Sequence, residues 1–252
     1  MKAIILAAGR GTRLSPLTDT VPKCMVEYNG QTLVRKSLET LNCCGINEIS
    51  IVGGYKIDVL QDHLLTQKIK YYTNNEFAVT NMVYSLFCAE PELNDDVIIS
   101  YSDIIYNKSV VLKLIADTSP VSVVVDKKWM DLWKLRMENP LDDAESLKLD
   151  NQYNIIELGK KTNNYSDIQG QYIGLIKIRK KVLKKIIDFY HLLDKNRLYD
   201  GKDFNNMYMT TFLQRIIDQL LPVKAVLIEG GWLEIDAISD ITAYQTHKIN
   251  IG

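Results

Sequence analysis

The chain has 252 residues, which suffices for one large α/β domain with a well-buried core. Its 30 lysines and arginines stand against 31 aspartates and glutamates, so the overall charge favours neither nucleic acid nor an anionic membrane as a partner. No apolar run approaches the roughly 18 residues of a membrane span, and residues 1–2 lead into a strand without a signal peptide, so we expect a soluble cytoplasmic protein.

Residues 3–7 predict a buried strand, and residues 8–13 predict a tight loop. Gly9 and Gly11 let the backbone turn there with positive φ and aim successive N–H groups at one point, which suits a phosphate chain. The dinucleotide fingerprint does not fit, because Leu14 stands where its third glycine belongs. The phosphate loop of many ATPases does not fit either, because its G-K-[ST] is missing.

The run 6–23 resembles the signature of nucleotidyltransferases that join a nucleoside monophosphate to a phosphorylated acceptor. Their pattern, L-A-A-G-x-G-[ST]-R-L-x-P-L-T-x-x-x-P-K, is matched by Leu6, Ala7, Ala8, Gly9, Gly11, Thr12, Arg13, Leu14, Pro16, Leu17, Thr18, Pro22 and Lys23. The resemblance implies a nucleotide site that includes Leu6, Ala8, Gly9, Gly11 and Thr12. It also implies two catalytic cations: Arg13 would neutralise the β- and γ-phosphates, and Lys23 would lie against the α-phosphate or the acceptor phosphate.

The next elements alternate between helix and strand: a helix over 32–44 that ends at Gly45, a strand over 49–52, a helix over 57–65 and a strand over 69–72. This order predicts a Rossmann-like, mostly parallel central sheet flanked by helices. Ligands of such sheets bind at the carboxyl ends of the strands, so the loops after Leu6, Val52 and Ile99 are the ones to watch.

The four cysteines lack the spacing of a metal site, and the adjacent pair Cys43-Cys44 at a helix end is poorly placed for a disulfide. We expect all four, Cys24, Cys43, Cys44 and Cys88, to be buried thiols in a reducing compartment.

Residues 80–86 predict a helix start with Thr80 or Asn81 as its cap. In the family that the chain resembles, an asparagine-containing turn here lies close to the nucleotide, so Asn81 is either a plain cap or a ligand contact. An apolar strand over 97–99 then runs through Ser102 into Asp103, which by resemblance holds Mg²⁺ against the α-phosphate. We assign Gly53, Asn81 and Ser102 to the nucleotide site as well.

The composition changes over 126–151, where charged and aromatic residues arrive without a clear period. We interpret this stretch as an insertion over the acceptor side of the cleft. Lys161 resembles the lysine with which related enzymes hold the acceptor phosphate, although Thr162 replaces the usual proline. The predicted acceptor contacts are Lys128, Arg136, Lys161, Tyr172 and Trp232. Acidic and aromatic side chains around this loop could hold an amino group by ion pairing and cation–π contact, or the aromatic ones belong to the core. These side chains are Trp129, Trp133, Asp142, Asp143, Tyr172 and Trp232.

Residues 179–193 predict an amphipathic helix whose lysine-rich face is more typical of a solvated surface than of a membrane contact. A helix from 209 to near Pro222 and a strand over 223–228 follow. The run 230–236 resembles the closing W-x-x-[IV]-[DN] element of the family, with Asp236 as the second Mg²⁺ ligand. We predict a single domain over 1–252, with a nucleotide-binding half over about 1–125 and an acceptor-binding half over about 126–252.

The expected reaction is attack by an acceptor phosphate or phosphonate oxygen on the α-phosphorus of a nucleoside triphosphate, with release of pyrophosphate. A phosphate monoester has a second pKa of about 6, so the nucleophile is already ionised at neutral pH and needs no general base. This agrees with the three histidines, which all lie outside the motifs. Cations and positioning must then supply the catalysis, and two aspartates suit Mg²⁺.

The short chain and the segments around residues 22–26, 133–145 and 169–172 resemble compact cytidylyltransferases, which act on phosphoglutamine, phosphocholine or aminoethylphosphonate for surface glycan decoration. The implied partners are CTP and a small phosphorylated acceptor, with phosphoglutamine as the preferred acceptor. A sugar-1-phosphate uridylyl- or thymidylyltransferase and a non-catalytic, nucleotide-sensing regulatory subunit remain alternatives. Hydrogen bonds near Gly9, Gly53 and Asn81 decide between cytosine and uracil, and the sequence does not supply their directions. The sequence leaves the oligomeric state open, and a homo-oligomer is among the options.

Overall fold

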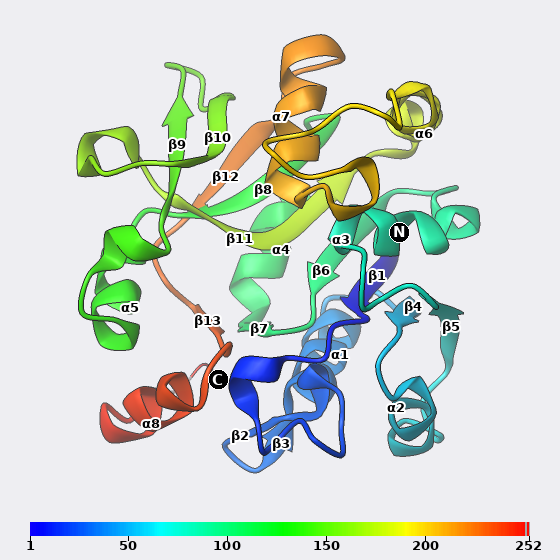
Figure 1. Cartoon of the computed structure of the whole chain (residues 1–252), viewed down its shortest axis with the longest axis vertical. Helices are drawn as coiled ribbons and strands as arrows, with labels where there is room; N and C mark the ends of the chain where they lie inside the picture. Colours follow the sequence, from blue (N-terminus) through cyan, green and yellow to red (C-terminus); the bar gives the residue numbers. More distant parts are fainter. Residues whose placement is uncertain (250, 252) are drawn as a thin grey trace.

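The computed structural model describes residues 1–249 and 251 and is built around one seven-stranded sheet (Figure 1). The strand order is β12 (Lys224–Ile228), β8 (Val121–Asp126), β11 (Gln171–Ile178), β6 (Val97–Tyr101), β1 (Lys2–Ala7), β4 (Glu48–Gly53) and β5 (Ile69–Thr73). Only β11 runs antiparallel to its neighbours β6 and β8. The predicted mostly parallel sheet is therefore confirmed.

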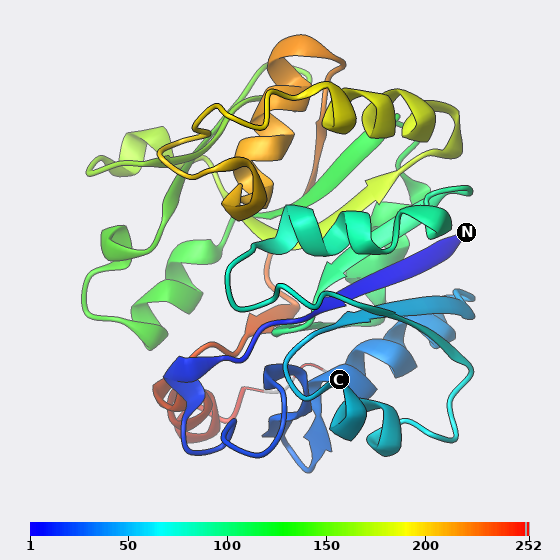
Figure 2. The same cartoon turned by 45° about the vertical axis from the view of Figure 1, so that its right-hand side comes forward.

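Helices cover both faces of the sheet (Figure 2). The eight α-helices are α1 (Leu33–Cys43), α2 (Ile57–His63), α3 (Met82–Cys88), α4 (Lys108–Ala116), α5 (Trp129–Arg136), α6 (Lys180–Leu192), α7 (Met209–Gln219) and α8 (Ile238–Thr246) within the described residues. Successive side chains of β1 point to opposite faces, because Ala3, Ile5 and Ala7 belong to one hydrophobic cluster and Ile4 and Leu6 to the other. The first cluster contains α1 and α4, and the second contains α3, α6 and α7.

The stretch 126–151 has more regular structure than predicted. Trp129, Leu132 and Trp133 are buried at helical spacing in α5, and β9 (Glu145–Leu149) pairs with β10 (Ile155–Lys161) in a small second sheet. The expectation of an irregular loop was wrong here. The sequence shows no clear period because the apolar repeat in α5 is only two turns long and charged residues interrupt it.

The predicted surface character of residues 179–193 is confirmed for α6, whose buried side chains are Leu183, Ile186 and Tyr190 while its four lysines are exposed. Among the described residues, no helix combines the length and apolarity that crossing a membrane requires.

The cysteine prediction was right on disulfides and wrong on burial. All four cysteines are free, but only Cys24 is buried, whereas Cys43 is exposed and Cys44 and Cys88 are partly exposed. Cys43 is the last residue of α1 and lies off the face that buries Leu38 and Leu41.

The buried carboxylate of Glu92 connects the inner strand β1 with the edge strand β5. Glu92, 6% exposed, accepts hydrogen bonds from Lys2 of β1 (2.9 Å) and from Tyr72 of β5 (2.7 Å), and it also pairs with Lys70. Burial alone would raise the pKa of Glu92, but these donors outweigh it and lower the pKa to about 2.

We therefore expect Glu92→Gln to lower the free energy of unfolding by about 2 to 3 kcal/mol at pH 7. Because the folded-state pKa lies below the unfolded one, this stabilisation is complete above about pH 5 and fades as the pH falls towards 2. Urea unfolding of wild type and variant at pH 7 and pH 3 measures it, with exposed Asp188→Asn as the control. A stability difference that is equally large at both pH values would contradict the assignment.

Candidate functional site

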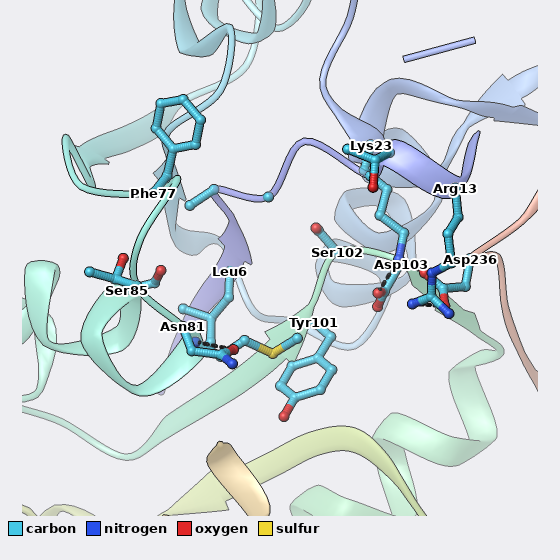
Figure 3. Close-up of a pocket in the computed structure, with 16 residues that line it drawn as sticks. Leu6, Arg13, Lys23, Phe77, Asn81, Ser85, Tyr101, Ser102, Asp103 and Asp236 are labelled. Atoms are coloured by element: carbon cyan, nitrogen blue, oxygen red, sulfur yellow. Dashed lines mark hydrogen bonds and ion pairs between the residues drawn. The ribbon is translucent and has the colours of Figure 1, made fainter. Parts of the chain in front are cut away.

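A cavity of about 300 Å³ opens where β1 and β6 end, beside the start of α3 (Figure 3). This cavity is lined by nearly all residues that the sequence assigned to nucleotide binding, catalysis or metal binding: Leu6, Ala8, Gly9, Gly11, Thr12, Arg13, Lys23, Asn81, Ser102, Asp103 and Asp236. Gly53 does not line the cavity. It is buried at the end of β4, where an added Cβ would lie 2.6 Å from Ile57.

The glycine loop brings Arg13 and Lys23, the two cations predicted to be catalytic, to the cavity. Gly11 has φ +73°, and a Cβ there would lie 2.8 Å from Cβ of Lys23, so only glycine allows the lysine to approach this closely. Thr18 Oγ1 donates to the Gly11 carbonyl (2.8 Å) and fixes the loop. Gly9 does not have the expected positive φ, so the left-handed turn rests on Gly11 alone.

Lys23 lies between the two predicted metal ligands. Its Nζ donates to Asp103 Oδ2 and Asp236 Oδ1, both at 2.6 Å, and Arg13 pairs with Asp236 from the solvent side. Burial by itself would lower the pKa of Lys23, but the two carboxylates outweigh burial and raise that pKa. Burial would likewise raise the pKa of Asp236, and the positive charge of Lys23 lowers it instead. Two cations thus balance two carboxylates.

The two aspartates come from distant parts of the chain. Asp103 follows β6, and Asp236 follows β13 (Trp232–Glu234), which pairs antiparallel with β7 (Ile104–Tyr106). The Ile235 N–H donates to the Asp103 carbonyl (2.9 Å), so this short ladder sets the aspartates side by side.

The donor set fits Mg²⁺. Asp103 Oδ1 is buried and has no hydrogen-bond partner among the described residues, which leaves one carboxylate oxygen free for a ligand. No group of three or more metal-binding side chains occurs in the described part of the chain. Two carboxylates completed by phosphate oxygens and water are what Mg²⁺ commonly takes at nucleotide sites.

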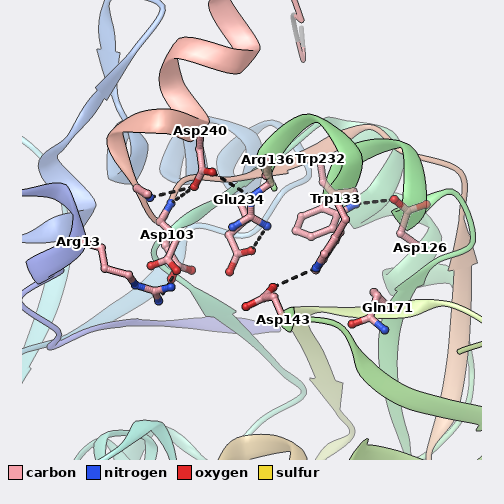
Figure 4. A network of polar contacts seen from close by, with 12 residues as sticks. Arg13, Asp103, Asp126, Trp133, Arg136, Asp143, Gln171, Trp232, Glu234 and Asp240 are labelled. Atoms are coloured by element: carbon pink, nitrogen blue, oxygen red, sulfur yellow. Dashed lines mark hydrogen bonds and ion pairs between the residues drawn. The ribbon is translucent and has the colours of Figure 1, made fainter. Parts of the chain in front are cut away.

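Arg136 has a supporting position instead of the predicted acceptor contact. Its side chain is only 4% exposed and pairs with Glu234 and with Asp240 (3.2 Å) (Figure 4). Asp240 in turn accepts hydrogen bonds from the backbone N–H groups of Asp236 and Ala237. Arg136 therefore holds the segment that carries Asp236.

A second cavity of about 210 Å³ adjoins the first and shares Asn81, Met82 and Tyr101 with it. Its other lining residues are acidic (Asp143, Glu145, Glu234), aromatic (Trp133, Tyr172, Tyr208, Trp232), polar (Gln171, Thr210) and apolar or glycine (Ile173, Gly174, Met209). Burial, reinforced by the charge of Asp143, raises the pKa of Glu145 to about 7. Burial also raises the pKa of Glu234 to about 7, although Arg136 opposes this rise.

Of the predicted acceptor residues, Tyr172 and Trp232 line this second cavity, and Lys128, Arg136 and Lys161 line neither of the two. Lys128 pairs with Glu229 (3.5 Å) on the surface, and Lys161 is exposed at the end of β10. The acidic character that the sequence expected from Asp142 and Asp143 is present in this cavity, but it comes from Asp143, Glu145 and Glu234, and the expected basic side chains lie elsewhere. The signal lay in Glu145 and Glu234, which belong to two segments that the sequence had singled out, residues 133–145 and 230–236.

Tyr101 separates the two cavities. A bulge in β11 between Tyr172 and Ile176 gives Gly174 φ +83°, and a Cβ at that position would lie 2.4 Å from the Tyr101 ring. The Tyr172 ring packs edge-on against Tyr101, and its hydroxyl is buried without a hydrogen-bond partner in the described structure. Sequence reasoning missed Tyr101 and Phe77, which no linear pattern marks, and it placed Thr80, Met82 and Ser85 in a helix start without assigning them to the site.

The family described as "MobA-like NTP transferase domain" matches residues 3–148. A CTP:phosphoglutamine cytidylyltransferase of Campylobacter jejuni is 50% identical over 248 residues, which cover 96% of this chain and 98% of the relative. A choline-phosphate cytidylyltransferase of Streptococcus pneumoniae is 38% identical over 108 residues, 42% of this chain and 46% of the relative.

Solved structures share the fold. The CTP:phosphocholine cytidylyltransferase of Streptococcus pneumoniae superimposes with a TM-score of 0.74 at 23% identity, covering 98% of this chain and 99% of that one. An inositol-1-phosphate CTP transferase of T. maritima reaches a TM-score of 0.72 at 22% identity, with 100% and 97% coverage.

Proposed function

Because the chain belongs to the MobA-like NTP transferase family, we propose that it is a Mg²⁺-dependent cytidylyltransferase that transfers CMP from CTP to a phosphorylated amino compound and releases pyrophosphate. The acceptor we propose is L-glutamine phosphate, with phosphocholine and aminoethylphosphonate as the other candidates. The main support is the 50% identity along nearly the whole chain to a protein named for this reaction. The acidic cavity beside the nucleotide cavity agrees with an amino-bearing acceptor.

The charged end of the first cavity would bind the phosphates. Arg13, whose side chain is 69% exposed, would contact the β- and γ-phosphates. Lys23 would donate to the α-phosphate, where negative charge builds up as the acceptor oxygen attacks. Asp103 and Asp236 would hold Mg²⁺, which when bound neutralises phosphate charge and orients the pyrophosphate leaving group.

The acceptor phosphate needs no base to lose a proton, because its second pKa lies near 6. In agreement, none of the three histidines lines either cavity among the described residues. The acceptor phosphate must enter the junction of the two cavities, which Tyr101, Asn81 and Met82 share, while its amino end extends into the second cavity.

The amino end of the acceptor would pair with Glu145. Two of the three carboxylates in the second cavity already have partners, since Asp143 accepts from Trp133 Nε1 (3.0 Å) and Glu234 pairs with Arg136. Glu145 has no cationic partner within the described structure. Glu145 is partly buried, and a partly buried carboxylate without a counter-ion favours a cationic ligand.

We therefore expect Glu145→Gln to raise KM for phosphoglutamine roughly 10- to 100-fold, because a charge-assisted hydrogen bond is lost. KM for CTP should stay within about twofold. Initial-rate kinetics with each substrate varied in turn make the measurement, and exposed Glu229→Gln is the matched control. Equal changes in both KM values would contradict this role of Glu145.

The proposal is tested by pyrophosphate release with Mg²⁺, scanning CTP, UTP, ATP, GTP and dTTP against phosphoglutamine, phosphocholine, aminoethylphosphonate and glucose-1-phosphate. Turnover with CTP and an amino-bearing acceptor only is the expected result. Turnover with UTP or dTTP and the sugar phosphate would establish the sugar nucleotidyltransferase instead, and no turnover would favour the regulatory subunit. The CDP-linked product is an activated donor, and we propose decoration of a surface polysaccharide such as a capsule as its use.

A further inference from the structure

The nucleotide cavity has a charged end and a weakly polar end (Figure 3). Arg13, Lys23, Asp103 and Asp236 lie together at the first, and residues 77–85 form the second. A nucleoside triphosphate with its phosphates at the charged end would therefore turn its base towards residues 77–85.

A buried asparagine organises this second end from behind the cavity wall. Asn74 is 1% exposed and does not itself line the cavity. Its backbone N–H donates to the Gly53 carbonyl (2.8 Å), and its Oδ1 accepts from the Glu76 N–H (2.9 Å). Its Nδ2 donates to two hydroxyls that do line the cavity, Thr80 Oγ1 (2.9 Å) and Ser85 Oγ (3.0 Å).

These contacts fix the direction of the hydrogen bonds that Asn74 and Thr80 make. Since a backbone N–H can only donate, the Asn74 oxygen must face Glu76 and the amide nitrogen must face the hydroxyls. Thr80 therefore accepts from Asn74 and gives its own proton to the Glu76 carbonyl (2.9 Å), so towards the cavity it offers only a lone pair. Ser85 also accepts from Asn74, but its proton is not committed within the described residues and remains free for a ligand.

The acceptor at Thr80 complements one pyrimidine and not the other. The edge of cytosine carries a donating amino group next to the accepting N3, whereas uracil carries an accepting O4 next to a donating N3–H. Uracil would set its O4 lone pair against the lone pair of Thr80, whereas the Ser85 hydroxyl keeps a proton and a second lone pair and can therefore serve N3 of either base. Such a mismatch at a half-buried group is costly, because the group loses its bonds to water.

We infer that Asn74 is a positioning residue for base selection, which fixes Thr80 as an acceptor and leaves the Ser85 proton free for a ligand, so that the cavity binds CTP in preference to UTP. This inference rests on the proposed function in that a nucleoside triphosphate fills the first cavity. It adds the residue that determines the preferred base. The sequence analysis expected the deciding hydrogen bonds near Gly9, Gly53 and Asn81.

The test measures the dissociation constants of CTP and UTP with Mg²⁺ by titration calorimetry, without an acceptor. Wild type should bind CTP at least about tenfold more tightly than UTP. Asn74→Asp keeps the shape and the bond from Glu76 but turns a donor into an acceptor, so Ser85 must give it its proton. The variant should reduce the CTP-to-UTP preference roughly tenfold or more, whereas exposed Asn94→Asp leaves it unchanged.

If Asn74 has a purely structural role, Asn74→Asp should weaken the binding of CTP and UTP equally, and that result would overturn the inference. A wild-type protein without preference for CTP would overturn it as well. If Asn74→Asp does not fold, Thr80→Val should lose the preference and Thr80→Ser should keep it, and equal preferences in these two variants would likewise overturn it. Turnover separates the two proposals: selective CTP binding without transfer to any acceptor contradicts the proposed function and leaves this inference standing.

Discussion

Asp103→Asn should lower kcat for CMP transfer roughly 100- to 1,000-fold, the cost of losing one charge contact aimed at the transition state. The amide keeps the size of the side chain but offers one oxygen instead of two and carries no charge. It can neither balance Lys23, which lies 2.6 Å away, nor serve as an anionic Mg²⁺ ligand.

Pyrophosphate release at a series of Mg²⁺ concentrations makes the measurement, with circular dichroism and thermal unfolding to show that the variant is folded. Exposed Asp142→Asn, which changes the same chemical group outside both cavities, should behave like wild type. An Asp103→Asn enzyme with near-normal, Mg²⁺-dependent turnover would refute the metal assignment.

Lys23→Met is expected to reduce kcat/KM by a similar factor for a different reason. It removes the cation that would contact the α-phosphate, and it leaves Asp103 and Asp236 facing each other without the ammonium that now joins them. In the nucleotide-free protein this substitution should strengthen Mg²⁺ binding, because Mg²⁺ no longer competes with Lys23 for the two carboxylates.

Thermal unfolding with and without Mg²⁺ tests the second part independently of activity. Mg²⁺ should raise the Tm of Lys23→Met more than that of wild type, whereas Lys184→Met, an exposed lysine on α6, should respond like wild type. Without Mg²⁺ the variant should also lose stability as the pH rises, since Lys23 no longer lowers the pKa of Asp236 and burial then disfavours the ionised form of that carboxyl in the folded protein. A Lys23→Met variant with unchanged Mg²⁺ response would contradict this account.

The nucleotide end of the site was predicted from sequence because its chemistry is local. The run 6–23 is contiguous, so a strand, one left-handed glycine and two cations at fixed spacing bring Arg13 and Lys23 to the cavity. Asp103 follows directly from β6, since the end of a parallel strand lies at the ligand edge of the sheet.

The acceptor end was predicted less well because long-range pairing decides it. Arg136 was expected at the acceptor, but its charge is used by Glu234 and Asp240, about 100 positions further along the chain. The second cavity is assembled from α5, β9, β11, β13 and α7, and its acidic character depends on which carboxylates remain unpaired after these elements pack.

By itself, the sequence determined the alternation of strands and helices, the glycine loop of residues 8–13 and the position of Asp103 at the end of a strand, since periodicity and short motifs act over neighbouring residues. Only the tertiary structure decided that Lys23 joins both aspartates, which carboxylates line the second cavity and that Asn74 donates to the hydroxyls of Thr80 and Ser85. The physical reason is that ion pairs and hydrogen bonds depend on distance and direction in space, and a linear pattern encodes neither for residues far apart in the chain.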